Sequence, residues 1–474
     1  MSFLNSKYTL PIILLLQAIL YIIVLYLFDG TGDSGDSVMH YLFAKHSFQH
    51  HELFFDHWAK PLFVLLASPF AQFGMLGMKL FNACVMLVCS AFTFKTIEKL
   101  RIENPGMGVI ILICTPLTFV LTFSGLTEPL FATLLIASLY LFVSDRLLIG
   151  CITASFLPFV RSEGLIILCV IFIYLLARRE LKLIPWLAAG SIIYMLAGAI
   201  VKGNLLWVFT EIPYAQLESP YHQLYSDKGR IFHFIIQMNY VVGVPIYALF
   251  WTGVVSYIVN IRKIIFNLNL TILVLGSFAA FFIAHSLFWY LGIFNSMGLK
   301  RVLIGVMPLI AIISLSGLNT VLSLIGRSAI LKKIVLPILL IVLLAFPFTS
   351  NPAAIHWEKD LNLASDQKLT LQIATFLQEN SLSDRRMFYM HPYLSESLSL
   401  DWFDSSKRGN LNNEGINEIQ SGDVVIWDNW FAVVEGGITE DYLLENESFS
   451  ELHSLSIYDH REVRFRVFEY QKKE

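Results

Sequence analysis

The chain has 474 residues, of which 56% are apolar and only 15% are charged. Its mean hydropathy of +0.64 is typical of a polytopic membrane protein and excludes a chain that is water-soluble over its whole length. The formal net charge of −3 gives no indication of nucleic-acid binding. All cysteines lie in apolar segments, so we predict neither a disulfide framework nor a zinc site.

The chain opens with an uncharged segment, 8–28, that is long enough to cross a bilayer. It lacks a small-residue cleavage site, so we expect an uncleaved first span. Allowing roughly 17–25 residues for each span, with a few shorter, we predict about eleven spans. The second is long and could break at Gly74 and Gly77. The predicted spans lie near residues 8–28, 62–94, 107–123, 127–143, 147–160, 163–177, 183–201, 236–260, 268–291, 302–318 and 334–349.

The loops between these spans alternate in character. One set is short and carries most of the loop lysines and arginines. Because basic residues favour the cytoplasmic side, we predict that this set and the N-terminus are cytoplasmic. The other set includes the longer, aromatic-rich loops 29–61, 202–235 and 292–301, which we expect to line a shared cavity on the outer side. An odd number of spans also places the C-terminal region outside.

The C-terminal region, 350–474, is polar and differs in composition from the apolar region 1–349. It contains one apolar-periodic helix near 363–379, followed by strand-like runs, the last of which alternates with period two. We therefore predict an α-helical polytopic membrane protein with a small C-terminal α/β extracytoplasmic domain. The strand-like runs are 387–390, 424–427 and 463–470.

Two acids follow the first span in its outer loop. Asp36 can begin a helix that runs through His40. In a purely structural interpretation, Asp36 is a helix cap and Asp33 a turn residue, but charge gathered at the membrane boundary is costly and often marks a site. The loop ends in a Lys-Pro step at Lys60. That lysine could extend to lipid phosphates without a specific role, or it could bind the phosphate of a lipid-linked substrate.

Three further charged elements lie at the predicted outer ends of later spans. Glu128 could cap the fourth span or line a cavity. Arg161 lies close to Glu163 in the chain, and it could form a local salt bridge with that residue or bind an anionic group. Lys300 and Arg301 begin the tenth span from outside, against the positive-inside rule, which calls for an anionic partner such as a phosphate.

Two other features can be explained without a role in catalysis. His285, in the ninth predicted span, is interpreted as a core histidine. The loop 202–235 contains Trp207 and several tyrosines, which suit either an aromatic belt at the membrane surface or a sugar-binding surface.

In their order and shared outer location, these elements resemble the GT-C superfamily of polytopic glycosyltransferases. They are most similar to the branch that holds the lipid A aminoarabinose transferase and the protein O-mannosyltransferases. That family has an acid-led Asp-Glu-x-x-Tyr helix and then a Lys-Pro-Pro step, where this chain has Asp36-Ser37 and Lys60-Pro61-Leu62. The resemblance covers roughly residues 1–345 and includes the elements 127–131, 161–164 and the start of the tenth span.

The resemblance implies a sugar donor on a polyprenyl or dolichyl phosphate and an inverting transfer to an acceptor hydroxyl. It implies Asp36 as the general base, with Asp33 as the second choice or as an orienting acid. Positive charge would stabilise the leaving phosphate. The phosphate-binding residues would be Lys60, Arg161 and Arg301, the residues lining the sugar or acceptor pocket would be Glu128, His40 and His57, and Lys300 would also bind substrate.

The partners implied are a polyprenyl-phosphate sugar, membrane lipids, and a glycan, lipid or protein acceptor. No metal site is predicted, because the candidate ligands match no defined motif, although a divalent metal could bind where they gather. A transporter or flippase would instead carry charges in mid-span on several helices, and a polymerase would not need the acid-led helix. We expect a bacterial inner membrane, with the site on its periplasmic face. The candidate metal ligands are Asp33, Asp36, Asp56, His40 and His57.

Overall fold

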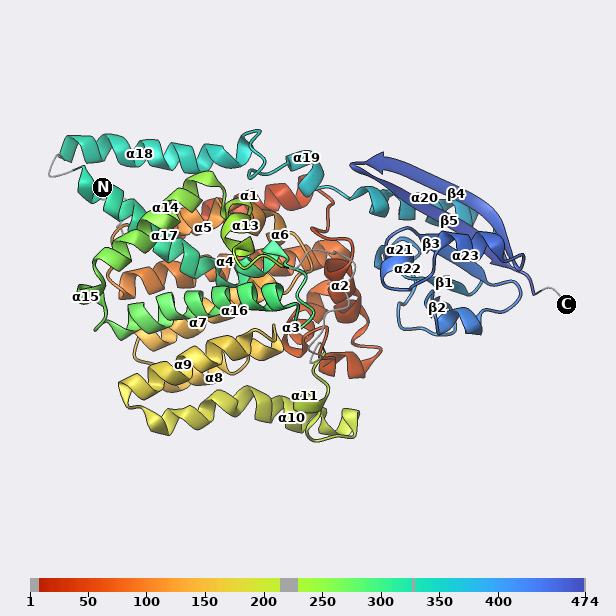
Figure 1. Cartoon of the computed structure of the whole chain (residues 1–474), viewed down its shortest axis with the longest axis horizontal. Coiled ribbons are helices and arrows are strands. Elements are labelled where there is room, and N and C mark those ends of the chain that lie inside the picture. Colours follow the sequence, from red (N-terminus) through yellow and green to blue (C-terminus); the bar gives the residue numbers. More distant parts are fainter. Residues whose placement is uncertain (1–7, 214–228, 326–328, 473–474) are drawn as a thin grey trace.

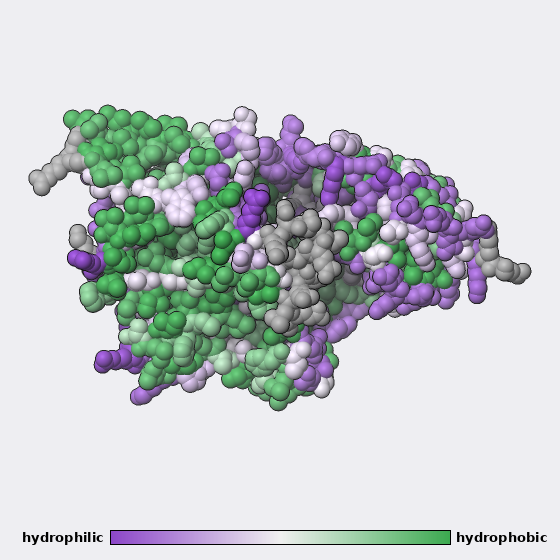
Figure 2. Space-filling model, in the orientation of Figure 1, coloured by the Kyte–Doolittle hydropathy of each residue, from purple (hydrophilic) through white to green (hydrophobic). Residues whose placement is uncertain are grey.

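The computed structural model describes residues 8–213, 229–325 and 329–472. Helices fill one part of the molecule, and a five-stranded sheet with short helices forms the C-terminal part beside it (Figure 1). Figure 2 shows mostly apolar surface over the helical part and mostly polar surface over the C-terminal part. This division of the surface is typical of a membrane-embedded helical bundle that carries a water-exposed domain.

The helical part consists of apolar helices that correspond to the predicted spans. In chain order they are α1 (Thr9–Leu27), α3 (Pro61–Ala71), α4 (Gly74–Lys99), α5 (Pro105–Ile113), α6 (Pro116–Thr122), α7 (Glu128–Val143), α8 (Leu147–Ala154), α9 (Gly164–Arg178), α10 (Ala189–Lys202), α13 (His233–Val242), α14 (Val244–Val259), α16 (Ser277–Leu291), α17 (Met307–Leu324) and α18 (Ala329–Ala345). Short helical segments extend some of these or connect them: η3 (Leu157–Phe159), η4 (Leu181–Ala188), α11 (Trp207–Thr210), α15 (Ile261–Ile264), η5 (Asn269–Gly276), η6 (Lys300–Val306) and η7 (Phe346–Phe348).

Among the described residues, six helices are long and apolar enough to cross a membrane, and the pair α5 and α6, bent by 69°, would make a seventh span. Five further apolar helices have only 10–17 residues. An integral multi-pass membrane protein is therefore confirmed, whereas the total of about eleven spans stays a prediction. The six helices are Thr9–Leu27, Gly74–Lys99, Leu181–Lys202, Asn269–Leu291, Lys300–Leu324 and Ile330–Phe348.

The predicted break in the second span is present. The helix α3 ends at Ala71, and α4 begins at Gly74, whose φ of +73° lies in the left-handed region. Glycine adopts this conformation without the steric cost that a side chain brings, so the chain can change direction here. The other predicted position, Gly77, lies inside α4.

The helix α17 forms the centre of the bundle. Most of its side chains are buried, whereas α1, α10 and α18 expose much of their apolar surface, as expected of helices that face lipid. Small residues allow α14 and α17 to approach closely. A Cβ added at Gly317 would lie 1.9 Å from the Leu249 carbonyl oxygen, and one at Gly253 would lie 2.1 Å from that of Ile313.

The C-terminal part contains a mixed sheet with the strand order β2-β1-β3-β5-β4. The strand β1 pairs in parallel with β2 and β3, and β5 pairs antiparallel with β3 and β4. The predicted helix and all three predicted strands are present, but β2 and β4 were not predicted. The elements are α19 (Trp357–Asp360), α20 (Ser365–Glu379), β1 (Met387–Tyr389), α21 (Pro392–Ser397), β2 (Arg408–Asn410), η8 (Gly415–Glu418), β3 (Val424–Asp428), α22 (Phe431–Val434), α23 (Glu440–Glu445), β4 (Phe449–Asp459) and β5 (Arg461–Tyr470).

Candidate active site

The first loop enters the space between the helical and C-terminal parts. It contains α2 (Asp36–His46) and η2 (His51–Phe55). Gly35 occupies the cap position of α2, and no side chain caps the helix, so the Asp36 carboxylate is free to make other contacts. One carboxylate oxygen of Asp33 accepts a hydrogen bond from the Gly35 backbone N–H at 2.7 Å, which leaves its other oxygen for a partner outside the loop.

Arg301, at the start of η6, binds both of these acids. Its Nη1 donates to Asp33 Oδ2 at 2.7 Å, and its Nη2 contacts Asp36 Oδ2. Its Nε lies 3.5 Å from Glu128 Oε1. One guanidinium therefore joins three carboxylates that come from two different elements, which is possible because its donors form a planar fork.

The charged cluster continues on the far side of Glu128. The Glu128 side chain is only 1% exposed, and its Oε1 lies 2.8 Å from Arg161 Nη1. Arg161 Nη2 in turn donates to Glu163 Oε1 at 2.8 Å, which confirms the predicted local salt bridge. His285 Nε2 lies 3.7 Å from the same Glu163 oxygen. The result is a continuous chain of alternating charge that runs from Asp36 inward to Glu163.

Lys60 lies beside this cluster but outside its ion pairs. Its backbone φ of +70° lies in the left-handed region. The ammonium donates to the Ser162 hydroxyl at 3.0 Å, and within the described part of the chain it forms no ion pair. A half-buried cation that is hydrogen-bonded to a neutral hydroxyl favours an anionic ligand.

Burial and neighbouring charges shift the pKa of three of these groups. Burial raises the pKa of the Asp36 carboxyl, but the positive charges around it, above all Arg301, together hold that pKa below its ordinary value. Burial also raises the pKa of Glu163, but the positive charge of Arg161, His285 and the hydrogen bonds to the carboxylate together outweigh burial and lower that pKa to about 2. Burial lowers the pKa of Lys60 to about 8. Asp36 and Glu163 are therefore ionised at neutral pH.

The C-terminal part holds the loop that carries the acids. Three hydrogen bonds join residues 30–34 of this loop to the segment 361–367. In addition, α22 packs against the loop, since a Cβ at Gly35 would lie 3.2 Å from the Phe431 ring. The three bonds run from Gly30 N to Leu361 O (2.8 Å), from Gln367 Nε2 to Thr31 Oγ1 (2.8 Å) and from Ser34 Oγ to Asp366 Oδ1 (3.0 Å).

The same part contributes a carboxyl that the sequence did not indicate. Glu435 follows α22 directly. Burial, and then the negative charges of Asp36 and Asp428, raise the pKa of Glu435 to about 7. A carboxyl from the end of the chain is thus in electrostatic reach of the acid that begins α2.

The remaining candidate residues lie around this cluster or away from it. His40 is buried, with its ring centroid 4.8 Å from that of Trp58, and burial lowers its pKa to about 3. The Nε2 atom of His57 lies 3.0 Å from the Val208 carbonyl oxygen. Lys300 lies next to Arg301 in the chain but lines a separate cavity, described below.

The suggested metal ligands do not form a group. Across the described residues, no three His, Cys, Asp or Glu side chains lie close enough to hold a metal ion. The Asp56 carboxylate instead accepts a hydrogen bond from the Ala59 backbone N–H at 2.8 Å. Much of the aromatic loop that could bind sugar, including 214–228, lies outside the described residues.

Solved structures with the same arrangement of helices and C-terminal sheet exist. The crystal structure of ArnT from Cupriavidus metallidurans bound to undecaprenyl phosphate has a TM-score of 0.56 with this chain, at 12% sequence identity, and the match covers 98% of each chain. The apo state of ArnT from the same organism has a TM-score of 0.59 at 9% identity, covering 96% of this chain and 97% of that one.

The chain has the GT-C fold. The match extends over nearly the whole length of both proteins, so it includes the C-terminal part as well as the helices. No protein-family model matches the chain, and no curated protein matches it. The expected fold class is therefore confirmed by the likeness in three dimensions.

Proposed function

We propose that this protein transfers a sugar from a polyprenyl or dolichyl phosphate to an acceptor hydroxyl, with inversion at the anomeric carbon. The observation that carries the proposal is the charged cluster. Asp36 is its most exposed acid, with 45% of the side chain accessible, while Glu128 and Arg161 behind it are largely buried. A reactive carboxylate at the open end of a rigid, buried charge network is what acid–base catalysis requires.

The donor phosphate would bind between Lys60 and Arg301. Lys60 has a neutral hydroxyl partner, so an anion beside its ammonium would offset the cost of burying that charge. Arg301 adds a planar donor group suited to phosphate oxygens. ArnT, which shares the fold, was solved with undecaprenyl phosphate bound, which is the lipid class that we propose for this chain.

Asp36 would act as the general base. In the transfer step, the acceptor hydroxyl gives its proton to the Asp36 carboxylate, and its oxygen bonds to the anomeric carbon. The bond from that carbon to the phosphate oxygen breaks, and the lipid phosphate leaves with the electron pair. Positive charge on Lys60 and Arg301 would stabilise the leaving group. Asp33, bound to the same guanidinium, is the second candidate for the base.

Arg301 also links donor binding to the strength of the base. Without a phosphate, its charge holds the pKa of Asp36 low, which makes that carboxylate a weak base. A bound phosphate would compete with Asp36 for the guanidinium, and the pKa of Asp36 would rise as a consequence. The base would then be strongest when the donor is in place. Glu128, held between two arginines, would keep Arg301 in position.

The positions of the charges favour an enzyme over a transporter or flippase. The arginines and acids of the cluster lie at one end of the bundle. The buried Lys79 of α4 belongs to this end too, since it donates to the backbone carbonyls of Phe28 and Gly30. A transporter would place such groups along the middle of several spans. The distribution of loop lysines and arginines supports an outer, periplasmic location for this end in a bacterial inner membrane.

The decisive experiment is sugar transfer by the purified full chain in lipid vesicles, supplied with a pool of radiolabelled polyprenyl-phosphate sugars. Wild type should consume at least one donor, and Asp36→Asn should lower the rate about 100-fold or more. Asp384→Asn, the same change at an exposed position, is the matched control. If Asp36→Asn transfers normally and Asp33→Asn does not, Asp33 is the base. If wild type consumes no donor, the transferase proposal fails.

A further inference from the structure

Two buried polar side chains lie on one face of α4, beneath the loops of the candidate site. Lys79 and Asn82 are three residues apart, so they share a face of the helix. Lys79 is only 4% exposed, and Asn82 is completely buried. Burying an ammonium and an amide in an apolar bundle is costly unless each group finds partners, so the partners of these two side chains indicate what they hold in place.

Lys79 binds the chain where it leaves α1. Its ammonium donates to the carbonyl oxygens of Phe28, at 2.9 Å, and of Gly30, at 3.2 Å. Between these two residues, the Asp29 carboxylate accepts a hydrogen bond from the Leu363 backbone N–H at 3.1 Å. The start of the first loop is therefore bound by α4 as well as by the C-terminal part.

Asn82 binds the turn that leads into α7. Its side-chain amide donates to the carbonyl oxygens of Ser124, at 2.7 Å, and of Leu126, at 2.9 Å. The helix α7 begins two residues later at Glu128, whose carboxylate contacts both arginines of the charged cluster. One face of α4 therefore binds the two segments that carry Asp36 and Glu128.

Ser37 joins these two segments to each other. It follows Asp36 in the chain and is completely buried. Its hydroxyl donates to the Thr31 carbonyl oxygen and accepts from the Gly125 backbone N–H, both at 2.6 Å. The two backbones are in contact here, since a Cβ added at Gly125 would lie 2.2 Å from the Ser37 carbonyl oxygen. The candidate base is thus the neighbour of the residue at which both segments meet.

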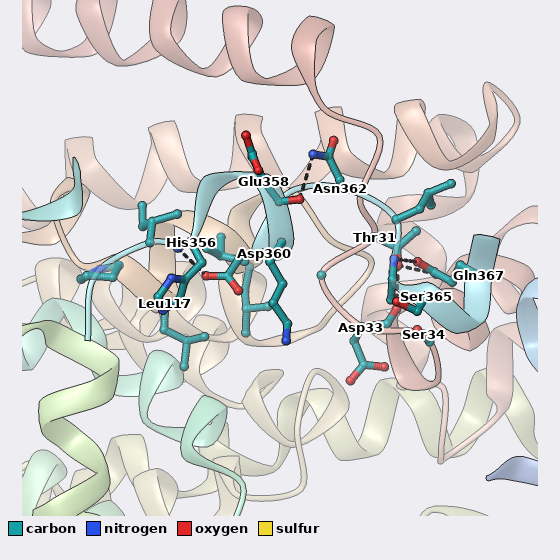
Figure 3. A pocket seen from close by; sticks show the side chains of 18 of the residues that line it. Thr31, Asp33, Ser34, Leu117, His356, Glu358, Asp360, Asn362, Ser365 and Gln367 are labelled. Carbon is teal, nitrogen blue, oxygen red and sulfur yellow. Dashed lines mark hydrogen bonds between the residues drawn. The ribbon is translucent and has the colours of Figure 1, made fainter. Parts of the chain in front are cut away.

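The other side of the first loop borders a cavity of about 510 Å³ between the helical and C-terminal parts (Figure 3). Residues 31–34 line this cavity together with α6, Lys300 and the segment 352–368. Figure 3 shows Thr31 hydrogen-bonded to Gln367 at its edge. A segment that borders a cavity has fewer packing contacts on that side, so hydrogen bonds on its other side contribute more to its position.

We propose that three buried residues, Lys79, Asn82 and Ser37, are positioning residues for the transfer reaction. The first two bind both segments to one face of α4, and the third couples the segments to each other. Together they set the position of Asp36 relative to Glu128, and so the placement of the candidate base within the charged cluster. The proposal rests on the proposed function, because the acids that are positioned belong to that reaction.

The first test separates the rate of transfer from donor binding. Lys79→Met removes the ammonium and keeps an unbranched side chain. With a donor that wild type consumes, we expect kcat to fall about tenfold or more, because the base is misplaced, while the KM for the donor changes less than about twofold. Lys79→Arg keeps donors for both carbonyls and should recover most of the lost rate. Lys95→Met, the same change at an exposed position of α4, is the matched control and should change neither constant.

A double variant tests whether Lys79 and Ser37 support the same arrangement. Ser37→Ala removes one hydroxyl and should by itself lower kcat about tenfold. If both residues support one arrangement, the double variant should be about as slow as the slower single variant, whereas independent effects would multiply. A multiplied loss, or wild-type kcat in Lys79→Met, overturns the proposal. If Lys79→Met does not fold, wild-type kcat in Ser37→Ala overturns it instead.

Hydrogen exchange followed by mass spectrometry reports the same contacts without any sugar donor. In Lys79→Met, amides within residues 28–37 and 124–128 should exchange about tenfold faster than in wild type, because local opening becomes easier. The strand β3, 424–428, should exchange at the wild-type rate. Unchanged exchange in the first two segments overturns the proposal even where kcat falls.

The outcome is separable from that of the proposed function. If wild type transfers sugar but Lys79→Met changes neither kcat nor exchange, the transferase stands and the positioning role is wrong. If exchange accelerates in both segments but wild type consumes no donor, the shared support of the two segments stands and the transferase proposal fails.

Discussion

The guanidinium of Arg301 binds the carboxylate of Asp33 at 2.7 Å, although 268 residues separate them in the chain. The same guanidinium reaches Asp36 and Glu128, so the first loop, the start of α7 and the start of η6 meet at one side chain. The position of the candidate base is thus set by the folding of the helical part together with the contacts of the first loop to the C-terminal part.

Glu128→Gln is expected to destabilise the protein through both arginines that it contacts. Each arginine keeps another carboxylate, Arg161 through Glu163 and Arg301 through Asp33, so neither charge is left alone. We therefore expect a loss of about 1–3 kcal/mol, typical of a lost hydrogen bond to a charged group. The midpoint of thermal unfolding in detergent would report it. Glu379→Gln, at the exposed end of α20, should leave the midpoint unchanged, and an equal effect of both substitutions would refute the prediction.

The catalytic efficiency with the proposed sugar donor should depend on the protonation of Lys60. Because burial lowers the pKa of Lys60 to about 8, its ammonium loses its charge as the pH rises through that value. The kcat/KM for the donor, which reports the free enzyme, should fall above about pH 8. Lys60→Arg keeps the charge at every accessible pH and should abolish this fall. If kcat/KM falls above about pH 8 in Lys60→Arg as it does in wild type, a group other than Lys60 causes the fall.

Glu435 should make the stability of the protein depend on pH. Its pKa is raised to about 7 from an ordinary value of 4.5, so the folded protein holds this proton more tightly than the unfolded chain. The contribution to stability is complete below about pH 4.5 and is lost as the pH rises to about 7. Glu435→Gln should therefore raise the unfolding midpoint at pH 8 and have little effect at pH 5. Glu445→Gln, an exposed change on α23, should show no such difference between the two values.

Gly35→Val should disturb the contact between the first loop and α22. A Cβ at this position already lies 3.2 Å from the Phe431 ring, so a branched side chain would push the two elements apart. Because small misplacements of a catalytic group can cost up to about 100-fold in rate, we expect kcat to fall by about tenfold or more. Adding Phe431→Ala should restore much of the loss by removing the ring. If the double variant is no faster than Gly35→Val, the contact does not explain the defect.

The charged elements of the site could be predicted because polar groups are rare in an apolar chain. Asp36, Lys60, Glu128, Arg161 and Arg301 stand out at the ends of apolar runs, and all five come together in the structure. The break in the second predicted span could also be predicted, because it occurs at Gly74, where the backbone adopts a left-handed conformation that glycine favours.

Other features depended on packing that no local pattern encodes. Lys300 and Arg301 are adjacent and chemically similar, yet Arg301 joins the charged cluster whereas Lys300 lines the neighbouring cavity, because η6 directs successive side chains apart. His57 contacts the ring of Trp207 of α11, and no pattern in the sequence indicates this contact. Nothing in the sequence around Glu435 marks it as a site residue. Its carboxyl comes within electrostatic reach of Asp36 only because α22 packs against the first loop. The strand β4 was missed because most of its residues are polar or exposed.

The hydrogen bond from Gly30 to Leu361 has a consequence for how the protein is made. A ribosome completes the first loop long before it reaches the segment that fixes it, so the loop has to wait until residues 361–367 have been made. A product that stops after α18 would contain the helical part but would lack every one of the three bonds that hold residues 30–34. The last quarter of the polypeptide therefore completes the candidate site, and a truncated copy in the membrane would carry the acids of the first loop without these contacts.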